Sequence, residues 1–164
     1  MTTIETKILT LLQENARYSV EELAVMVGSD KDTVEATIRG LEQKGAILGY
    51  TAVLNPEIID EDSVSALIEV KVTPQARSGF DSFADRIAAF DEVKAVYLMS
   101  GTYDLSIRLE GKTLREISTF VGEKLSSIEG VTSTATHFIM KRYKEDGVST
   151  ESANAKNRVL PLSE

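Results

Sequence analysis

The most constraining feature of the sequence is residues 19–49, where a short amphipathic segment, a glycine and a longer amphipathic segment follow one another. The first segment begins with a capping box, in which the Ser19 hydroxyl and the Glu22 carboxylate each accept a free amide hydrogen at a helix start. Gly28 permits the left-handed turn that ends this helix, and the next helix follows at once, over 29–44. Two helices joined by so tight a turn predict a helix-turn-helix.

The segments that flank this pair extend the motif. An apolar helix is expected over 3–14, and a short β segment is expected after Gly45. Together they predict a winged helix-turn-helix domain over residues 1–50, a unit that typically lays its second helix in the major groove of DNA. The residues expected to contact bases or phosphates are Arg17, Lys31, Thr33, Thr37, Arg39 and Lys44.

The charge of the chain opposes this interpretation. The formal net charge is −8, and residues 1–50 hold five basic against eight acidic side chains, a net charge of −3. Affinity for duplex DNA comes largely from Lys and Arg on phosphates. The alternative is therefore a sensing and assembly module whose helix-turn-helix binds DNA weakly or not at all.

Beyond residue 50 the hydrophobic pattern changes. A linking strand and an acidic hinge are expected over 51–62, and from residue 63 the apolar period changes from 3.6 to 2. The expected elements are a strand over 63–73, a helix over 79–90, strands over 93–100 and 105–109, a helix over 113–129 that buries Leu114, Ile117, Val121, Leu125 and Ile128, and a strand over 131–143. This β-α-β-β-α-β order predicts a ferredoxin-like domain over 63–146, and so an α+β chain of two domains.

The end of the chain is polar and irregular. We expect a mobile tail over 147–164, in which the apolar segment Val159–Leu162 docks on a neighbouring molecule. The basic residues that precede it, Lys141, Arg142 and Lys144, are interpreted as the solvated end of the last strand.

The composition excludes several classes of function. There are no cysteines and one histidine, His137, so thiol chemistry, zinc–thiolate sites and histidine-based catalysis are not expected. The first residues lack the basic start and the apolar stretch that are typical of a signal peptide, and no apolar run approaches the roughly 20 residues that a membrane span needs. We expect a cytoplasmic protein that is not an enzyme, with no catalytic residues, metal or cofactor.

The segment Gly101-Thr102-Tyr103-Asp104 lies between two expected strands and has two interpretations. Spacing alone favours a plain hairpin turn, whereas the family resemblance given below favours a site for a free amino acid. In the second case Asp104 supplies an anion for the ammonium group, and backbone N–H groups around Gly101 bind the carboxylate, because glycine lets a ligand approach the main chain closely.

Several short segments, in this order and at these spacings, resemble the leucine-responsive/asparagine-regulator (Lrp/AsnC) family of transcription factors. They are Ile8-Leu-x-Leu-Leu, Ala16-Arg17-Tyr-Ser19, Glu22-Leu-Ala24, Val27-Gly-Ser29, Leu41-Glu-x-x-Gly45, Ile47-x-Gly-Tyr50 and Ser100-Gly-x-Tyr-Asp104. Members usually carry arginines on the second helix of the motif where this sequence has Thr37 and Gly40, so weaker DNA binding is expected.

The resemblance implies a homodimer formed through the ferredoxin-like domains, with dimers assembling into octamers. It implies that a small metabolite such as an amino acid binds at the Gly-x-Tyr-Asp turn and modulates assembly or affinity for double-stranded DNA. Thr134 and Thr136, on one face of the last strand, are expected near the turn of a neighbouring subunit. A further alternative is an enzyme similar to the sirohaem decarboxylases that resemble this family, although the chain has few of the His and Arg residues that a tetrapyrrole pocket needs.

Overall fold

The computed structural model of the chain describes residues 1–59, 63–73 and 79–150. The chain divides into two compact units, Met1–Val53 and Leu54–Glu164. Among the helices in these described ranges, none is both long and apolar enough to span a bilayer.

The first unit consists of α1 (Thr3–Glu14), α2 (Val20–Val27) and α3 (Lys31–Gln43). Each helix starts at a residue whose side chain accepts an amide hydrogen, namely Thr2, Ser19 and Asp30. Gly28 ends α2 with φ of 71°, a left-handed conformation that favours glycine. One face of each helix is buried in a small core formed by Ile8, Leu23, Ala24, Val34 and Leu41. The predicted helix-turn-helix is confirmed.

The strand expected after α3 does not form. Residues 47–55 pair with no other strand in the described part of the chain. A strand is stable only when its backbone groups have partners, and the described residues contain no partner strand for this segment. The Tyr50 side chain is held separately, by a hydrogen bond of 2.9 Å from its hydroxyl to Glu42 Oε1 at the end of α3. A single helical turn, α4 (Pro56–Ile59), occupies the start of the expected hinge, and residues 60–62 lie outside the described residues.

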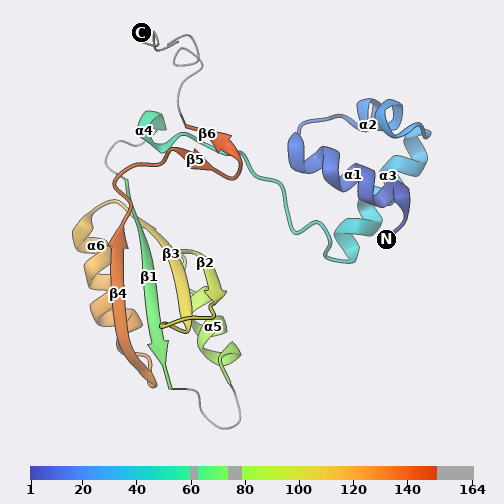
Figure 1. Ribbon diagram of the computed structural model, residues 1–164. Coiled ribbons are helices and arrows are strands. Elements are labelled where there is room, and N and C mark those ends of the chain that lie inside the picture. The colour runs from blue at the N-terminus through green and yellow to red at the C-terminus, as the bar shows by residue number, and fades with distance from the viewer. Residues whose placement is uncertain (60–62, 74–78, 151–164) are drawn as a thin grey trace, which may run out of the picture. The chain divides into compact units, whose positions relative to one another are not determined.

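The second unit contains a four-stranded antiparallel sheet with helices on one face (Figure 1). Its elements are β1 (Val64–Val72), α5 (Asp81–Ala88), β2 (Val93–Leu98), β3 (Leu105–Gly111), α6 (Leu114–Thr119), the π-helical turn η1 (Phe120–Leu125) and β4 (Val131–Phe138). The strands lie in the order β2-β3-β1-β4. This is the predicted ferredoxin-like β-α-β-β-α-β arrangement.

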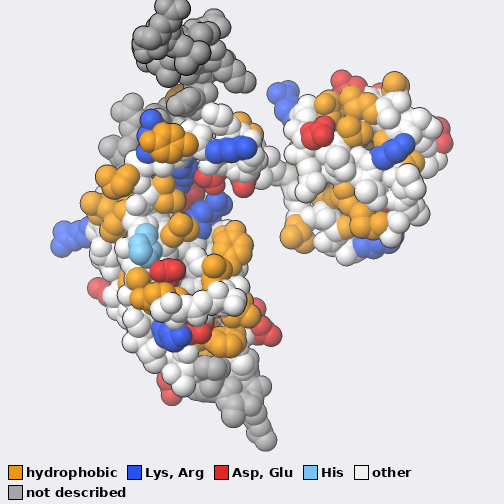
Figure 2. All heavy atoms as spheres, in the orientation of Figure 1, with side chains coloured by type: hydrophobic (Ala, Val, Ile, Leu, Met, Phe, Trp, Pro, Cys, Tyr) orange, Lys and Arg blue, Asp and Glu red, His pale blue; other side chains and the backbone are white. Residues whose placement is uncertain are grey.

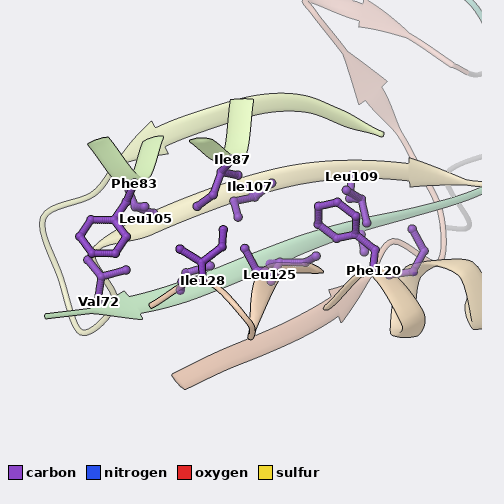
Figure 3. Close-up of a cluster of buried hydrophobic side chains, with 13 residues drawn as sticks. Val72, Phe83, Ile87, Leu105, Ile107, Leu109, Phe120, Leu125 and Ile128 are labelled. Atoms are coloured by element: carbon purple, nitrogen blue, oxygen red, sulfur yellow. The ribbon is translucent and has the colours of Figure 1, made fainter. Parts of the chain in front are cut away.

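The core of this unit lies between the sheet and its helices. Alternate residues of β1 and β3 point toward α5, α6 and η1, where they meet Phe83, Ile87 and Phe120 (Figure 3). The rings of Phe90 and Phe120 pack edge to face, with centroids 5.3 Å apart. The opposite side of the sheet, called the open face below, carries Leu67, Glu69, Lys71, Tyr97, Arg108 and His137.

The second helix of this unit differs from the expected continuous α-helix. At η1 the helix is wider than an α-helix, because its hydrogen bonds join residues five positions apart instead of four. The Ser126 N–H, for example, donates to the carbonyl of Val121. Leu114, expected in the core, is 56% exposed. It is the first residue of α6, and side chains in a first turn point back beyond the start of their helix, so Leu114 projects away from the layer that Ile117 enters.

The region expected to begin a tail is partly ordered instead. Two short strands, β5 (Lys144–Glu145) and β6 (Val148–Ser149), form a hairpin whose turn residues Asp146 and Gly147 both have positive φ. The Glu145 carboxylate accepts a hydrogen bond of 2.7 Å from Arg108 and lies 3.4 Å from Arg142, whose side chain is only 15% exposed. Arg142 therefore holds the hairpin and is not a solvated strand end. Residues 151–164, including the segment 159–162, lie outside the described residues.

Candidate DNA-binding helix and effector turn

Helix α3 carries most of the residues expected to contact DNA, and its first turn is held by a network at Asp30. The Asp30 carboxylate accepts hydrogen bonds from the backbone N–H of Thr33 at 2.8 Å and from the Thr33 hydroxyl at 2.7 Å. These two bonds hold the pKa of Asp30 below its ordinary value, and the bond from the Thr33 hydroxyl has the larger effect. The Thr37 hydroxyl donates to the Thr33 carbonyl at 2.7 Å. Both threonines thus use their hydroxyl protons within the helix.

The expected DNA-contacting cations are exposed, but three of them are paired with carboxylates. Lys31 pairs with Glu21 on α2, Arg39 with Glu35 one turn earlier on α3, and Lys44 with Glu5 on α1 at 3.1 Å. The Glu21 carboxylate raises the pKa of Lys31. Exposed pairs of this kind stabilise the fold little, so phosphates can displace them at small cost.

Arg17 lies in the connection between α1 and α2, and in the described residues its guanidinium forms no ion pair. On the visible side of this unit the blue cationic side chains stand apart from one another, with red acidic groups among them (Figure 2). Because three of the four expected cations are paired with carboxylates, the six expected contact residues do not form one strongly basic patch.

The carboxylates of this unit predict a loss of stability in acid. Bonds to the Thr2 amide and to Lys44 lower the pKa of Glu5 from 4.5, and the Lys31 ammonium lowers that of Glu21 from 4.5. A carboxyl with a lowered folded-state pKa stabilises the fold above its unfolded pKa and loses that contribution as pH falls through the folded value. We expect the melting temperature to stay level down to about pH 5 and to fall below it.

Circular dichroism melts between pH 7 and pH 3 measure this dependence, with Asp30→Asn as the matched variant. Asparagine caps a helix as well as aspartate does but does not titrate, so the acid-side fall should be shallower in Asp30→Asn than in the wild type. Identical slopes would remove Asp30 from the set of groups responsible.

The second candidate site is the connection between β2 and β3, which β1 fixes in place. The β1–β3 ladder ends at the pair Val70 and Leu105. Beyond it the Asp104 N–H donates to the Val70 carbonyl at 3.0 Å, and Asp104 Oδ2 accepts the Val72 N–H at 2.9 Å. The Asp104 carboxylate thus replaces the next backbone acceptor of the ladder, which lets residues 100–103 leave the sheet as the expected hairpin turn.

The tip of this turn is open. Gly101 and Thr102 are exposed, Tyr103 and Asp104 are half-buried, and a side chain built on Gly101 would meet nothing within 4 Å. In the described residues the N–H groups of 100–103 donate to no protein acceptor. The turn therefore presents free backbone donors next to a carboxylate, which is the chemistry that a free amino acid requires.

Thr134 and Thr136 do not approach this turn within one chain. Thr134 pairs with Val70 and Thr136 with Ile68, both fully buried in the core, and paired residues share a face. The two threonines therefore lie on the helix side of the sheet. His137 lies on the open face, with Nε2 3.1 Å from Glu69 Oε2. Among the residues described, no group of acidic, His or Cys side chains is placed to hold a metal ion.

Residues 1–42 of the chain match the AsnC-type helix-turn-helix domain, and residues 65–149 match the Lrp/AsnC ligand binding domain. The chain belongs to the Lrp/AsnC family. It is a transcriptional regulator of the Lrp/AsnC type with a helix-turn-helix and a ligand-binding domain.

Relatives of this Lrp/AsnC protein cover nearly its whole length. The HTH-type transcriptional regulator YugG of Bacillus subtilis (strain 168) is 42% identical over 161 residues, 98% of this chain and 97% of the relative. The leucine-responsive regulatory protein of Haemophilus influenzae is 30% identical over 142 residues, 87% of this chain and 85% of the relative. The structure of the transcriptional regulator NMB0573 from Neisseria meningitidis, in complex with L-Met, aligns with a TM-score of 0.71 at 27% identity, covering 88% of this chain and 93% of that one.

Proposed function

We propose that this Lrp/AsnC regulator binds double-stranded DNA through α3 and its ends, and that a free amino acid bound at Gly101–Asp104 changes its assembly or its DNA affinity. The observation that carries the ligand half is the exposed turn, where free N–H groups lie beside the Asp104 carboxylate in the domain that matches a ligand-binding family. The related NMB0573 structure, described as an L-Met complex, supports an amino acid as the effector.

For DNA, the proposed contacts are Arg17, Lys31, Thr33, Thr37, Arg39 and Lys44. The cations are exposed, and Lys31, Arg39 and Lys44 can each exchange the carboxylate of a surface pair for a phosphate. With a net charge of −3 over residues 1–50, one such unit binds weakly. Several units in one assembly raise the overall affinity, because each later contact is made at a high effective concentration.

We propose that the assembly is built from homodimers that join through the open face and then associate further, up to an octamer. This face is only partly covered in the single chain, and Leu67 and Tyr97 are 40% and 56% exposed on it. Figure 2 views this side, where several orange hydrophobic side chains lie near the pale-blue histidine and a red acidic group lies beside it. In such an assembly Thr134 and Thr136 of one copy are proposed to lie near the turn of another.

The pairing of Lys31, Arg39 and Lys44 with carboxylates favours a second candidate, a sensing and assembly module with little DNA affinity. A gel shift with the DNA upstream of the protein's own gene separates the two. Retardation at low salt that weakens steeply as salt rises supports DNA binding, whereas no retardation at any salt supports the second candidate.

The effector half is tested by a thermal-shift screen of the twenty amino acids, with light scattering in parallel to follow assembly. A ligand that binds only the folded protein raises the melting temperature in proportion to the logarithm of its concentration. No shift with any of the twenty would contradict an amino-acid effector.

A further inference from the structure

Lys71 brings a positive charge to the Gly101–Asp104 turn. It lies near the end of β1 on the open face, since its neighbours Val70 and Val72 are buried on the helix side. Its Nζ donates a hydrogen bond of 2.7 Å to the Thr102 carbonyl and lies 3.7 Å from Asp104 Oδ1. The turn therefore presents an ammonium group and a carboxylate side by side.

This pair is loose, so both groups keep binding capacity. At 3.7 Å the Lys71 to Asp104 distance is longer than a hydrogen bond. Lysine has three N–H donors, of which one is used by Thr102. Asp104 uses Oδ2 for the Val72 N–H, while Oδ1 has the Lys71 ammonium as its neighbour. One oxygen and at least one ammonium hydrogen thus remain for a ligand.

We infer that Lys71 and Asp104 together bind the two charged ends of the effector: Lys71 the α-carboxylate and Asp104 the α-ammonium. The inference rests on the proposed function, since it names the residues that recognise the amino acid at the proposed turn. A free amino acid carries its ammonium and its carboxylate on the same carbon atom, so a site selective for it needs opposite charges close together. Asp104 alone would accept any amine.

The surrounding structure fixes the pair in position. Asp104 is tied to β1 by its own N–H and by Oδ2, on either side of Lys71 in the strand. Glu69 is the next acidic group along the open face of β1. Its Oε2 lies 3.1 Å from His137 Nε2, so Glu69 has a partner other than Lys71. The free N–H groups of 100–103 add neutral donors for the same carboxylate.

The test compares the affinity for an amino acid with that for its α-carboxamide, which keeps the ammonium and lacks the carboxylate. The probe is the amino acid with the largest thermal shift in the screen above, and titration calorimetry gives both affinities for the full-length wild type, Lys71→Met and Lys71→Arg. Lys124→Met is the matched control, because Lys124 also pairs with a carboxylate, Glu92, and is 45% exposed against 46% for Lys71. It lines a groove at the other end of β3, beside Gly111.

We expect Lys71→Met to weaken binding of the amino acid about fivefold, because one half-exposed contact between opposite charges is lost. Binding of the amide should change little, because the amide has no carboxylate for Lys71 to contact. The preference for amino acid over amide should therefore shrink in Lys71→Met, return in Lys71→Arg and stay unchanged in Lys124→Met. A purely structural role of Lys71 would weaken both ligands equally.

An unchanged preference in Lys71→Met overturns the assignment. Tighter binding in that variant also overturns it, because Lys71 would then compete with the ligand's ammonium. If the wild type binds none of the twenty amino acids, the proposed effector itself fails and this inference falls with it, a result distinct from an amino acid that binds without needing Lys71.

Discussion

Gly40→Arg is expected to tighten binding to the upstream DNA about tenfold near 0.1 M salt, because one added phosphate contact steepens the salt dependence of log K by about 0.9. Gly40 lies on α3 with nothing within 4 Å of the position that a Cβ would take. An arginine therefore enters the helix without a clash, on the segment that also carries Thr37. Arginine is in addition a better helix former than glycine.

Gly40→Ala is the matched control, since it also replaces glycine by a better helix former but adds no charge. It should raise the free energy of unfolding by roughly 1 kcal/mol and leave DNA affinity unchanged. Gel shifts at four salt concentrations, together with urea denaturation, measure both quantities. If Gly40→Arg is stabilised like Gly40→Ala but binds DNA no better, α3 does not lie at the DNA.

The parts of the fold that local chemistry determines were predictable from the sequence. The capping box at Ser19 and the left-handed Gly28 mark helix boundaries by interactions over a few residues, and the structure places the start and the end of α2 there. The alternation over Val64–Val72 identified the buried face of β1, because successive side chains of a strand point to opposite faces of the sheet and helices cover one of these faces. Such signals need no knowledge of distant residues.

The parts that depend on distant contacts were not predictable in the same way. The alternation at 50–54 is typical of a strand, but the described residues offer it no partner. The hairpin at 144–149 had a local signal, because the Asp146-Gly147 pair is typical of a two-residue hairpin turn. The prediction of a tail in this region did not take that pair into account. At the turn, Gly101–Asp104 was visible in the sequence, whereas Lys71 lies 33 positions earlier than Asp104 and joins the turn only through the β1–β3 pairing.

Asp104→Asn is expected to abolish the thermal shift caused by the effector amino acid while leaving the stability of the free protein close to that of the wild type. The asparagine side-chain oxygen still accepts the Val72 N–H, whose bond to Asp104 is 2.9 Å long, but the negative charge for the ligand's ammonium is gone. Asp104→Ala is expected to lose the ligand response and also about 1–3 kcal/mol of stability, because the Val72 amide is then left without its acceptor.

Comparing these two variants separates recognition of the ligand from support of the turn. Thermal shifts with and without the amino acid measure the first, and urea denaturation without ligand measures the second. Asp85→Asn, an exposed residue of α5, controls for the loss of one acidic group. If Asp104→Asn keeps the full ligand response and only Asp104→Ala loses it, Asp104 acts by holding the turn on β1, and the ammonium of the effector must bind another acceptor.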